Sequence, residues 1–327
     1  MMADGEKVLV RVPASTANLG PGFDTLGMAL NLYAWIEMAA AERNDISLFG
    51  DELRGVPADE SNLVFQVAQR VFREAGIRMP CLSIAMYSDI PLTRGLGSSA
   101  SAIIGAMAAA NALAGSPLTD DDMFQMATRM EDHPDNVGAS LFGGIVVAQW
   151  DGERARKIRI EPPARLEVLA VIPEFHLSTE KARQALPGSV ALKDAVFNVA
   201  GSSLLVAALA AGDLAMIRHA MRDALHQPYR AALIPGMRRI LAEAPDHGAL
   251  GAALSGAGPT LLALADAASC DKLRLERFML GAFAQEGVAA KALWLKPDRG
   301  GVQILTSPGG NSTFIDNIRH IKGEVRA

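Results

Sequence analysis

Residues 91–102 have the sequence Pro91-Leu-Thr-Arg-Gly-Leu-Gly-Ser-Ser-Ala-Ser-Ala102, and this stretch decides the fold. It follows a short apolar segment, residues 82–86, that predicts a strand, and it leads into residues 102–114, an alanine-rich segment with high helix propensity. Gly95 and Gly97 carry no Cβ, so the backbone can turn tightly and approach a ligand closely. The first amides of the helix have no intrahelical acceptor and lie at the positive end of the helix dipole. The stretch therefore predicts an anion site, most suitably for phosphate.

The alternative interpretation is a plain turn closed by a serine N-cap, which is the simpler explanation of an isolated short match. A Rossmann oxidoreductase is disfavoured, because Gly95-Leu-Gly97 lacks a third glycine at the spacing of a dinucleotide-binding fold. The sequence also lacks a Gly-x4-Gly-Lys-Ser/Thr motif, and the one basic residue of the loop, Arg94, precedes both glycines. A phosphate held here would be neutralised by backbone amides, the helix N-terminus and a metal ion.

The composition is typical of a soluble enzyme of two domains. The chain has 327 residues, of which 50% are hydrophobic, enough for a sizeable core. Its net charge of −5 argues against nucleic acid or an anionic membrane as a partner. Cys81 and Cys270 form neither a disulfide framework nor a metal cluster, so we expect reduced thiols and a cytoplasmic protein. Residues 1–7 lack the apolar core of a signal peptide, and apolar runs such as residues 204–211 are far shorter than the roughly 20 residues of a membrane span.

Hydrophobic periodicity and turn residues predict the order of the elements. Strands are expected at residues 7–13, 25–40, 82–86, 143–150, 166–172, 261–265 and 290–295. Helices are expected at residues 61–72, 102–114, 119–132, 178–186, 194–211, 214–225 and 269–286, with Ser61 and Thr119 as N-caps of the first and third. Residues 13–24 are expected to form an irregular loop. Pro162-Pro163 is the expected domain boundary, and the order of elements after it predicts a ferredoxin-like domain.

Three glycine-rich segments follow one another along the chain: Pro13-Ala-Ser-Thr-Ala-Asn-Leu-Gly-Pro-Gly-Phe-Asp24, residues 91–102, and Leu254-Ser-Gly-Ala-Gly-Pro-Thr260. This order resembles the superfamily of galactokinase, homoserine kinase, mevalonate kinase and phosphomevalonate kinase (GHMP kinases). Within the superfamily the chain is most similar to the homoserine kinases. The markers are Asn18-Leu-Gly-Pro-Gly-Phe-Asp24, His133-Pro-Asp-Asn136, Ser178-Thr-Glu-Lys-Ala-Arg183 and Pro228-Tyr-Arg230. The resemblance covers about residues 8–305.

The resemblance implies an α+β, two-domain GHMP kinase fold. Residues 1–162 would form an N-terminal, ATP-binding domain like the second domain of ribosomal protein S5, and residues 163–305 a ferredoxin-like C-terminal domain. Residues 306–327 remain as a tail of uncertain order. The implied activity is ATP-dependent phosphorylation of the side-chain hydroxyl of L-homoserine, a step of threonine biosynthesis, with Mg²⁺ as the metal ion and a homodimer as the family's usual assembly.

The resemblance also assigns the nucleotide site. The residues that would contact ATP are Pro91, Leu92, Thr93, Arg94, Gly95, Leu96, Gly97, Ser98, Ser99, Ala100 and Ser101, with Asn62 near the adenine. Ser98 and Glu131 would hold Mg²⁺, which prefers hard oxygen ligands. Ser98, Glu131 and Asn18, which the resemblance places beside the acceptor hydroxyl, are the expected catalytic residues. Taken alone, Asn62 is equally explained as a residue at a helix start, and Glu131 as a solvated carboxylate at a helix end.

A site for homoserine needs hydrogen-bond donors at one end and carboxylates at the other, because the molecule is a zwitterion. Arg183 and Arg230 can bind its carboxylate, since guanidinium pairs with carboxylate in a bidentate manner. Asp24 and Asp135 can bind its ammonium group, and His133 can contact either end. By resemblance, Gly258 and Thr260 of the third motif close the site.

The expected reaction is direct in-line transfer of the γ-phosphoryl group, without a strong general base. The aspartate–lysine pair of mevalonate-type relatives is missing, because the sequence has no lysine between Lys7 and Lys157. Asp132, where homoserine kinases commonly have glycine, and Ala139-Ser-Leu-Phe142 depart from the family pattern and leave the acceptor less certain. The alternatives are a kinase for mevalonate or shikimate and a catalytically silent relative, although a silent relative would usually have lost the loop glycines or Glu131.

Overall fold

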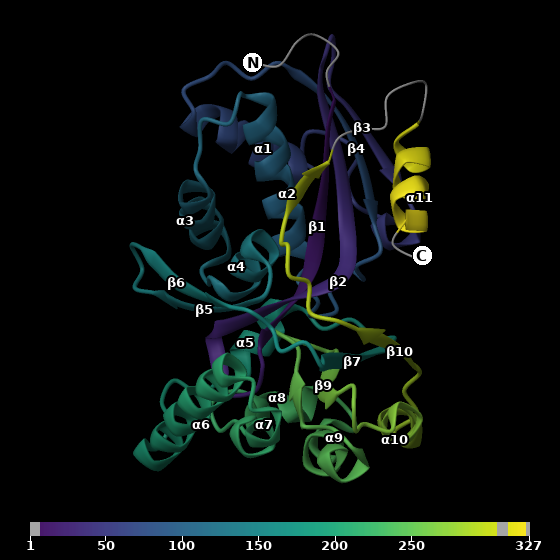
Figure 1. The fold of residues 1–327 in the computed structure, drawn as a ribbon. Coiled ribbons are helices and arrows are strands. Elements are labelled where there is room, and N and C mark those ends of the chain that lie inside the picture. Colours follow the sequence, from purple (N-terminus) through teal and green to yellow (C-terminus); the bar gives the residue numbers. More distant parts are fainter. Residues whose placement is uncertain (1–6, 306–312, 325–327) are drawn as a thin grey trace.

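Two β-sheets, one from each half of the chain, organise the computed structural model, which describes residues 7–305 and 313–324 (Figure 1). The chain passes from the first sheet to the second near Pro162-Pro163, and the exact domain limits stay a prediction. Residues 1–6, which the expectation about a signal peptide concerns, lie outside the described residues. So do residues 306–312 and 325–327 of the expected tail.

The first sheet has the strand order β11-β1-β2-β4-β3; β5 pairs with the first part of β2, and β6 pairs with β5. Its strands are β1 (Lys7–Asn18), β2 (Gly22–Ala41), β3 (Asp45–Phe49), β4 (Cys81–Ser88), β5 (Ile145–Trp150), β6 (Ala155–Ile160) and β11 (Gln303–Leu305). Along β1, Val8, Val10 and Val12 enter the core that is closed by helices. Those helices are α1 (Leu63–Glu74), α2 (Ser98–Leu113), α3 (Asp120–Glu131) and α4 (Asp135–Phe142). Because side chains alternate along a strand, Leu9, which lies between Val8 and Val10 in β1, faces the other side of the sheet.

The second sheet is antiparallel and has the strand order β10-β7-β9-β8, which is the ferredoxin-like order. Its strands are β7 (Leu166–Pro173), β8 (Gly251–Leu254), β9 (Leu261–Asp266) and β10 (Ala290–Leu295). The helices of this half are α5 (Thr179–Gln184), α6 (Leu192–Ala211), α7 (Leu214–Ala220), α8 (Gln227–Arg230), α9 (Met237–Glu243) and α10 (Lys272–Gln285). Every residue of β7 and β9 is buried, because α9 and α10 cover one face of the sheet while α6, α7 and the start of β2 cover the other. Burial on both faces explains why these strands are continuous apolar runs in the sequence.

Several expectations from the sequence are wrong in detail. Residues 13–24 are not an irregular loop: β1 continues to Asn18 and β2 begins at Gly22, with irregular register at Pro13/Ala14 and Ala17/Asn18. These register shifts let the strands carry glycine, proline and small polar residues. The N-cap of α1 is Asn62 rather than Ser61, whereas Thr119 caps α3 in a full capping box with Asp122.

The tail also differs from expectation. Residues Phe314–Glu324 form helix α11, which packs on the face of the first sheet that the other helices leave open (Figure 1). Phe314 and Ile318 are buried against Leu9 and Trp35, and the ammonium group of Lys322 lies 2.7 Å from Asp89. The sequence did not indicate this packing, because the helix finds its partners on strands about 280 residues earlier.

Helix α6 contradicts the expectation that no apolar stretch approaches the length of a membrane span. It has 20 residues and is apolar and long enough to cross a membrane by length and composition alone, and 22% of that stretch is buried in the protein. The sequence interpretation underestimated it because Asn198, Ser202 and Ser203 interrupt the apolar run without ending the helix.

Candidate active site

The three glycine-rich segments meet at the junction between the two halves of the molecule. Ser255 of the third segment donates a hydrogen bond from Oγ to the carbonyl of Gly95, 2.6 Å away, and lies 2.8 Å from Oγ1 of Thr16 in the first. The backbone amide of Gly256 donates to Ala17, and that of Ser15 donates to Leu96. These bonds join three segments that are far apart in the sequence, so they form one site.

The loop before α2 requires glycine at two positions. Gly95 and Gly97 have φ values of 79° and 69°, in the left-handed region that strains other residues. A Cβ on Gly95 would lie 2.3 Å from the carbonyl oxygen of Ser255, and one on Gly97 would lie 2.1 Å from Oγ of Ser15. The glycines therefore serve both the turn and the close packing of the three segments.

The N-terminus of α2 is not capped by a side chain. Gly97 is the N-cap residue and makes no side-chain hydrogen bond, whereas Ser101 donates from Oγ to the carbonyl of Ser98. The first-turn amides of α2 are thus left for an anion at the positive end of the helix dipole. This arrangement supports the phosphate interpretation over a turn with a serine cap.

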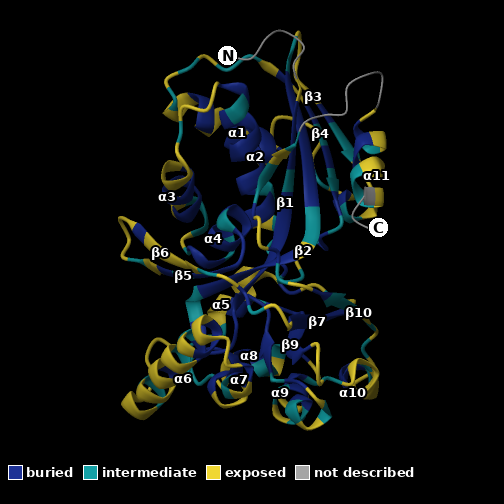
Figure 2. Ribbon diagram, in the orientation of Figure 1, coloured by how far each residue is buried: buried dark blue, intermediate teal, exposed yellow. Residues whose placement is uncertain are grey.

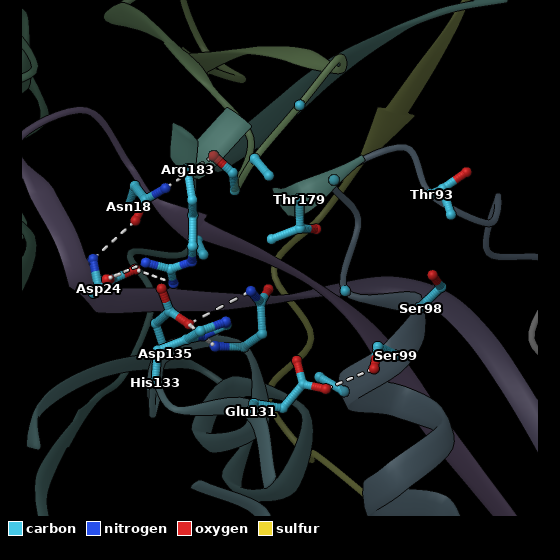
Figure 3. A pocket seen from close by; sticks show the side chains of 18 of the residues that line it. Asn18, Asp24, Thr93, Ser98, Ser99, Glu131, His133, Asp135, Thr179 and Arg183 are labelled. Atoms are coloured by element: carbon cyan, nitrogen blue, oxygen red, sulfur yellow. Dashed lines mark hydrogen bonds and ion pairs between the residues drawn. The ribbon is translucent and has the colours of Figure 1, made fainter. Parts of the chain in front are cut away.

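Glu131 lies beside this helix N-terminus, at the end of α3. Its Oε1 accepts a 2.6 Å hydrogen bond from Oγ of Ser99, and Ser98 lines the same pocket (Figure 3). Asp132 follows with a φ of 62°, a left-handed residue that ends α3. Aspartate adopts this conformation more readily than most residues, which explains how it can stand at a position that commonly holds glycine.

The pocket next to the loop has a volume of about 170 Å³ and receives charged side chains from both halves of the molecule. Asp24 and Arg183 form a bidentate ion pair across it, with N–O distances of 3.0 and 3.1 Å (Figure 3). Burial lowers the pKa of Arg183, but the hydrogen bonds and charge of Asp24 outweigh it, so the pKa is raised. The two residues that the sequence assigned to opposite ends of the substrate are therefore paired with each other.

A second charged pair lies on the floor of the pocket. Nδ1 of His133 donates to Oδ1 of Asp135 over 2.7 Å, and Asp135 is only 1% exposed. Burial lowers the pKa of His133, but the hydrogen bond and charge of Asp135 outweigh burial, so the pKa is raised to about 9. His133 is thus cationic at neutral pH and balances one of the two carboxylates.

Arg230 is buried, and its guanidinium is held by three acceptors. It donates to the carbonyls of Ala182 and Gly256 and, over 3.3 Å, to Nδ1 of His226. Burial lowers the pKa of Arg230 to about 10. Burial also lowers the pKa of His226, and a neutral ring donates from Nε2 to the carbonyl of Gly20 while accepting from Arg230. Arg230 lies 5.3 Å from the centre of the Phe23 ring, which stacks on His226.

The segment between Asn18 and Asp24 is strained and fixed by one amide side chain. Asn18, Leu19 and Asp24 all have positive φ, at 74°, 47° and 54°. Oδ1 of Asn18 accepts from the amide of Asp24, and Nδ2 donates to the carbonyl of Gly256. Strain of this kind is retained where surrounding structure enforces it, often at functional sites. Asn18 thus positions Asp24 and the third segment.

Most of the predicted site residues line the pocket. They are Asn18, Asp24, Thr93, Gly95, Gly97, Ser98, Ser99, Ala100, Glu131, His133, Asp135, Arg183, Arg230 and Gly258. Thr260 is buried behind the loop, where its amide donates to the carbonyl of Arg94. Leu96 and Ser101 are also buried, whereas Pro91, Leu92 and Arg94 line an adjacent cavity of about 280 Å³.

Asn62 lies away from this pocket. Its Oδ1 caps α1 at the amide of Val64, and its Nδ2 donates to the carbonyl of Pro57. Both ends of the side chain are therefore engaged within its own segment, and its contact with adenine stays a prediction.

Four of the site residues that the sequence interpretation missed show what signal was available. Ser255 joins the first two segments, Phe23 packs against both arginines, and Thr179 lines the pocket beside Arg183. Asn136 accepts a hydrogen bond from Oγ of Ser15. Phe23, Thr179, Asn136 and Ser255 all lie inside the motifs quoted above, so their position in the motifs was the available signal.

Asp24, His133 and Asp135 could be taken for a metal site, because one ligand atom of each lies within 4.8 Å of the others. The geometry favours another interpretation, because Nδ1 of His133 is engaged with Oδ1 of Asp135 over 2.7 Å. Asp24 is also neutralised by Arg183. This cluster is better suited to a charged organic molecule.

Comparison with known proteins identifies the family of the chain. The family model "GHMP kinases N terminal domain" matches residues 62–144, and "GHMP kinases C terminal" matches residues 205–276. The fold also resembles a crystal structure of mevalonate kinase, with a TM-score of 0.61 at 18% identity over 89% of this chain and 99% of that one. The chain belongs to the GHMP kinases.

Its similarity to one group of GHMP kinases is much higher. A homoserine kinase of Desulfitobacterium hafniense is 42% identical over 91% of this chain and its own full length, and one of Deinococcus radiodurans is 41% identical over 93% of this chain and 99% of its own. The crystal structure of homoserine kinase from Cytophaga hutchinsonii has a TM-score of 0.82 and 28% identity, over 93% of this chain and 99% of that one. Within the GHMP kinases, the chain groups with the homoserine kinases.

Proposed function

We propose that the protein transfers the γ-phosphoryl group of ATP to the side-chain hydroxyl of L-homoserine, giving O-phospho-L-homoserine for threonine biosynthesis. The observation that carries this proposal is the junction of an uncapped helix N-terminus with a small pocket that holds both signs of charge. The two relatives named above, at 42% and 41% identity, are homoserine kinases.

The charges of the pocket match a zwitterion. Arg230 and His133 are cations that can receive a carboxylate, and Asp24 and Asp135 can receive an ammonium group. Arg183 can exchange its ion pair with Asp24 for one with the substrate. An exposed pair of this kind contributes about 0–1 kcal/mol, so the exchange costs little. Mevalonate and shikimate carry no ammonium group and would leave one carboxylate without a partner.

The residues that line the pocket position the reactants for in-line attack. The hydroxyl oxygen of homoserine forms a bond with the γ-phosphorus as the bond to the bridging oxygen of ADP breaks. No strong base is needed, because the transition state is loose and the proton can pass to a phosphate oxygen or to water. The amides of α2 bear part of the charge that develops on the phosphate oxygens. Asn18 holds the acceptor segment in place beside them.

Ser98 and Glu131 suit Mg²⁺, because both offer hard oxygen atoms at the edge of the phosphate loop. When bound, Mg²⁺ would neutralise charge on the phosphates. Glu131 is already oriented by Ser99, which fixes the carboxylate without using its second oxygen. A cytoplasmic location, which suits a reaction of ATP with a free amino acid, and the homodimer implied by the resemblance are also part of this proposal.

The test is an ADP-release assay with Mg·ATP and L-homoserine, mevalonate or shikimate as acceptor, with the product identified by mass spectrometry. Two analogues test the zwitterion directly: 4-hydroxybutyrate lacks the ammonium group, and 2-amino-1,4-butanediol lacks the carboxylate. Each should lower kcat/KM by about 10–100-fold, the loss of a hydrogen bond to a charged group. Turnover with mevalonate or shikimate but none with homoserine would refute the proposal, and no turnover with any acceptor would favour a silent relative.

A further inference from the structure

Residues 175–183, which connect β7 to α5 and include most of that helix, form a connecting segment that contacts both ends of the active-site pocket. At the end near the loop before α2, Nη1 of Arg94 donates a hydrogen bond to the carbonyl oxygen of Phe175 over 2.7 Å. The next residue, His176, shares a hydrogen bond with Thr93, with 2.8 Å between Nδ1 and Oγ1. The connecting segment therefore holds this loop just before its two glycines.

The other end of the connecting segment holds the charged groups of the proposed acceptor site. Arg183 pairs with Asp24 at N–O distances of 3.0 and 3.1 Å (Figure 3). The carbonyl oxygen of Ala182 accepts a hydrogen bond from Nε of Arg230 over 3.1 Å. Thr179 lies between the two ends and lines the pocket. One short piece of chain thus reaches from the loop to both arginines.

Thr93 makes the contact with the loop sensitive to movement. Its φ is 54°, a left-handed value that is a genuine outlier for a β-branched residue. Such a conformation is retained only where the surrounding structure enforces it. Among the described residues, His176 is the one hydrogen-bond partner of the Thr93 side chain, and Thr93 lines the same pocket as Ser98. A shift of His176 would therefore be transmitted to the wall of the pocket.

The connecting segment is loosely held by the rest of the molecule but is joined internally. Of residues 175–183, only Leu177 and Ala182 are buried, and α5 lies largely exposed at the surface (Figure 2). Segments with few buried contacts open at low cost. Within the segment, Oγ of Ser178 accepts a hydrogen bond from the amide of Lys181 over 3.2 Å and caps α5. The segment can thus move as one unit, as coupling between two sites requires.

We infer that the connecting segment couples the two substrates, so that L-homoserine bound at Arg183 raises the affinity of the pocket for Mg·ATP, and Mg·ATP raises that for L-homoserine. This inference rests on the proposed function. Either substrate orders the segment from its own end, and the second substrate then binds to a segment that is already ordered. Coupling between two binding sites is reciprocal, so one factor describes both effects. His176 is a positioning residue in this scheme, because it acts on the pocket through Thr93.

The first experiment measures the dissociation constant of the non-hydrolysable analogue AMP-PNP with Mg²⁺ by isothermal titration calorimetry, with and without saturating L-homoserine. We expect homoserine to lower this constant at least about fivefold, the lower end of the usual range for coupled sites. The reverse titration, of homoserine with and without AMP-PNP, should give the same factor.

His176→Ala should reduce this coupling factor to about 1, while homoserine alone binds as it does to the wild type, because Arg183 stays in place. A merely structural role would weaken both ligands without changing the ratio. His176→Gln should keep part of the factor, since its amide can still form a hydrogen bond with Thr93. The matched control is His219→Ala, which replaces an exposed histidine of α7 and should keep the full factor. Both histidines are exposed, so the variants should fold, and circular dichroism checks this.

Thr93→Val tests the same contact from the other side, because valine keeps the β-branched shape and removes the hydroxyl group. It should lower the coupling factor as much as His176→Ala does, and the double variant should lower it no further. Additive losses in the double variant would show that the contact between Thr93 and His176 is not the link.

A coupling factor of about 1 or below in the wild type, with both ligands bound, would overturn the inference and leave the proposed function intact. A factor that survives both His176→Ala and Thr93→Val would overturn it as well. If homoserine bound neither alone nor with AMP-PNP, the proposed function would fail and the inference with it.

Discussion

The two ends of the active-site pocket are built from different parts of the chain. At the proposed nucleotide end, the backbone amides at the start of α2 have no side-chain cap, and two glycines let the loop pack closely against Ser15 and Ser255. At the acceptor end, charged side chains from both halves of the molecule are paired with one another. This difference indicates that the proposed phosphate site depends on backbone shape, whereas the proposed acceptor site depends on a balance of charges that a substrate can exchange.

The largest effect is expected from Gly95→Ala at the nucleotide end. The new Cβ would lie 2.3 Å from the carbonyl oxygen of Ser255, in a residue with a φ of 79°, so the loop must shift. We expect kcat/KM for ATP to fall at least about 10²–10³-fold, the effect of misplacing donors to a transition state. Steady-state kinetics measures this loss.

The matched control is Gly152→Ala. Gly152 also has a positive φ, of 91°, but a Cβ there meets nothing within 4 Å. This variant should lose about 1 kcal/mol of stability and keep its activity. If both variants lost activity alike, the close approach of the loop would not matter.

A smaller effect should separate the two serines that start α2. Ser98→Ala should lower kcat by about 10²-fold and raise the Mg²⁺ concentration needed for half-maximal rate, because it removes a proposed metal ligand. Ser99→Ala should cost about tenfold or less, since Ser99 only orients Glu131. Rates measured over a range of Mg²⁺ concentrations distinguish them, and the opposite ranking would exchange the two roles.

At the acceptor end, breaking the Asp24–Arg183 pair should alter binding more than chemistry. Asp24→Asn and Arg183→Ala should each raise the KM for homoserine by about 10–100-fold and lower kcat by less than about tenfold. The free-energy loss in kcat/KM for the double variant should be smaller than the sum of the losses for the two single variants, because the residues contact each other. A loss of kcat beyond about 10²–10⁴-fold in Asp24→Asn, with the KM unchanged, would instead make Asp24 a general base.

The smallest effect concerns the charge of His133. Its pKa in the folded protein is raised from 6.5 to about 9, so its charged form stabilises the fold. This contribution is complete below about pH 6.5 and is lost as the pH rises through about 9. His133→Gln removes it, so the difference in Tm between wild type and variant should shrink between pH 7 and 10.

Arg230, whose pKa of about 10 lies in a neighbouring range, is present in both the wild type and His133→Gln. Its contribution therefore cancels in the difference in Tm. A difference in Tm that stays constant with pH would show that His133 is neutral. In that case Asp135 would carry an unbalanced charge on the pocket floor.

The difference between the two ends of the pocket also explains which features of the site could be predicted from the sequence. Gly95, Gly97 and the helix after them were predictable because turn and helix are set by neighbouring residues. That Asp24 pairs with Arg183 was not predictable, because the two side chains meet only after the two halves of the chain have packed. Thr260 shows the same limit, since its motif is evident in the sequence but its burial behind the loop is a property of the assembled fold.

The sequence by itself indicated most of the long helices and strands, the anion loop and, through its motifs, the membership among GHMP kinases, but it did not indicate β3, β6, α4, α9 or α11. The features that it indicated are local or depend only on spacing along the chain. The tertiary structure alone decided that β1 and β2 extend through the first glycine-rich segment, that α11 covers the open face of the sheet, and that one face of α6 is left exposed. Each depends on contacts between residues far apart in the sequence. Forming such contacts costs chain entropy, which is offset only by tertiary packing that cannot be predicted from the sequence pattern.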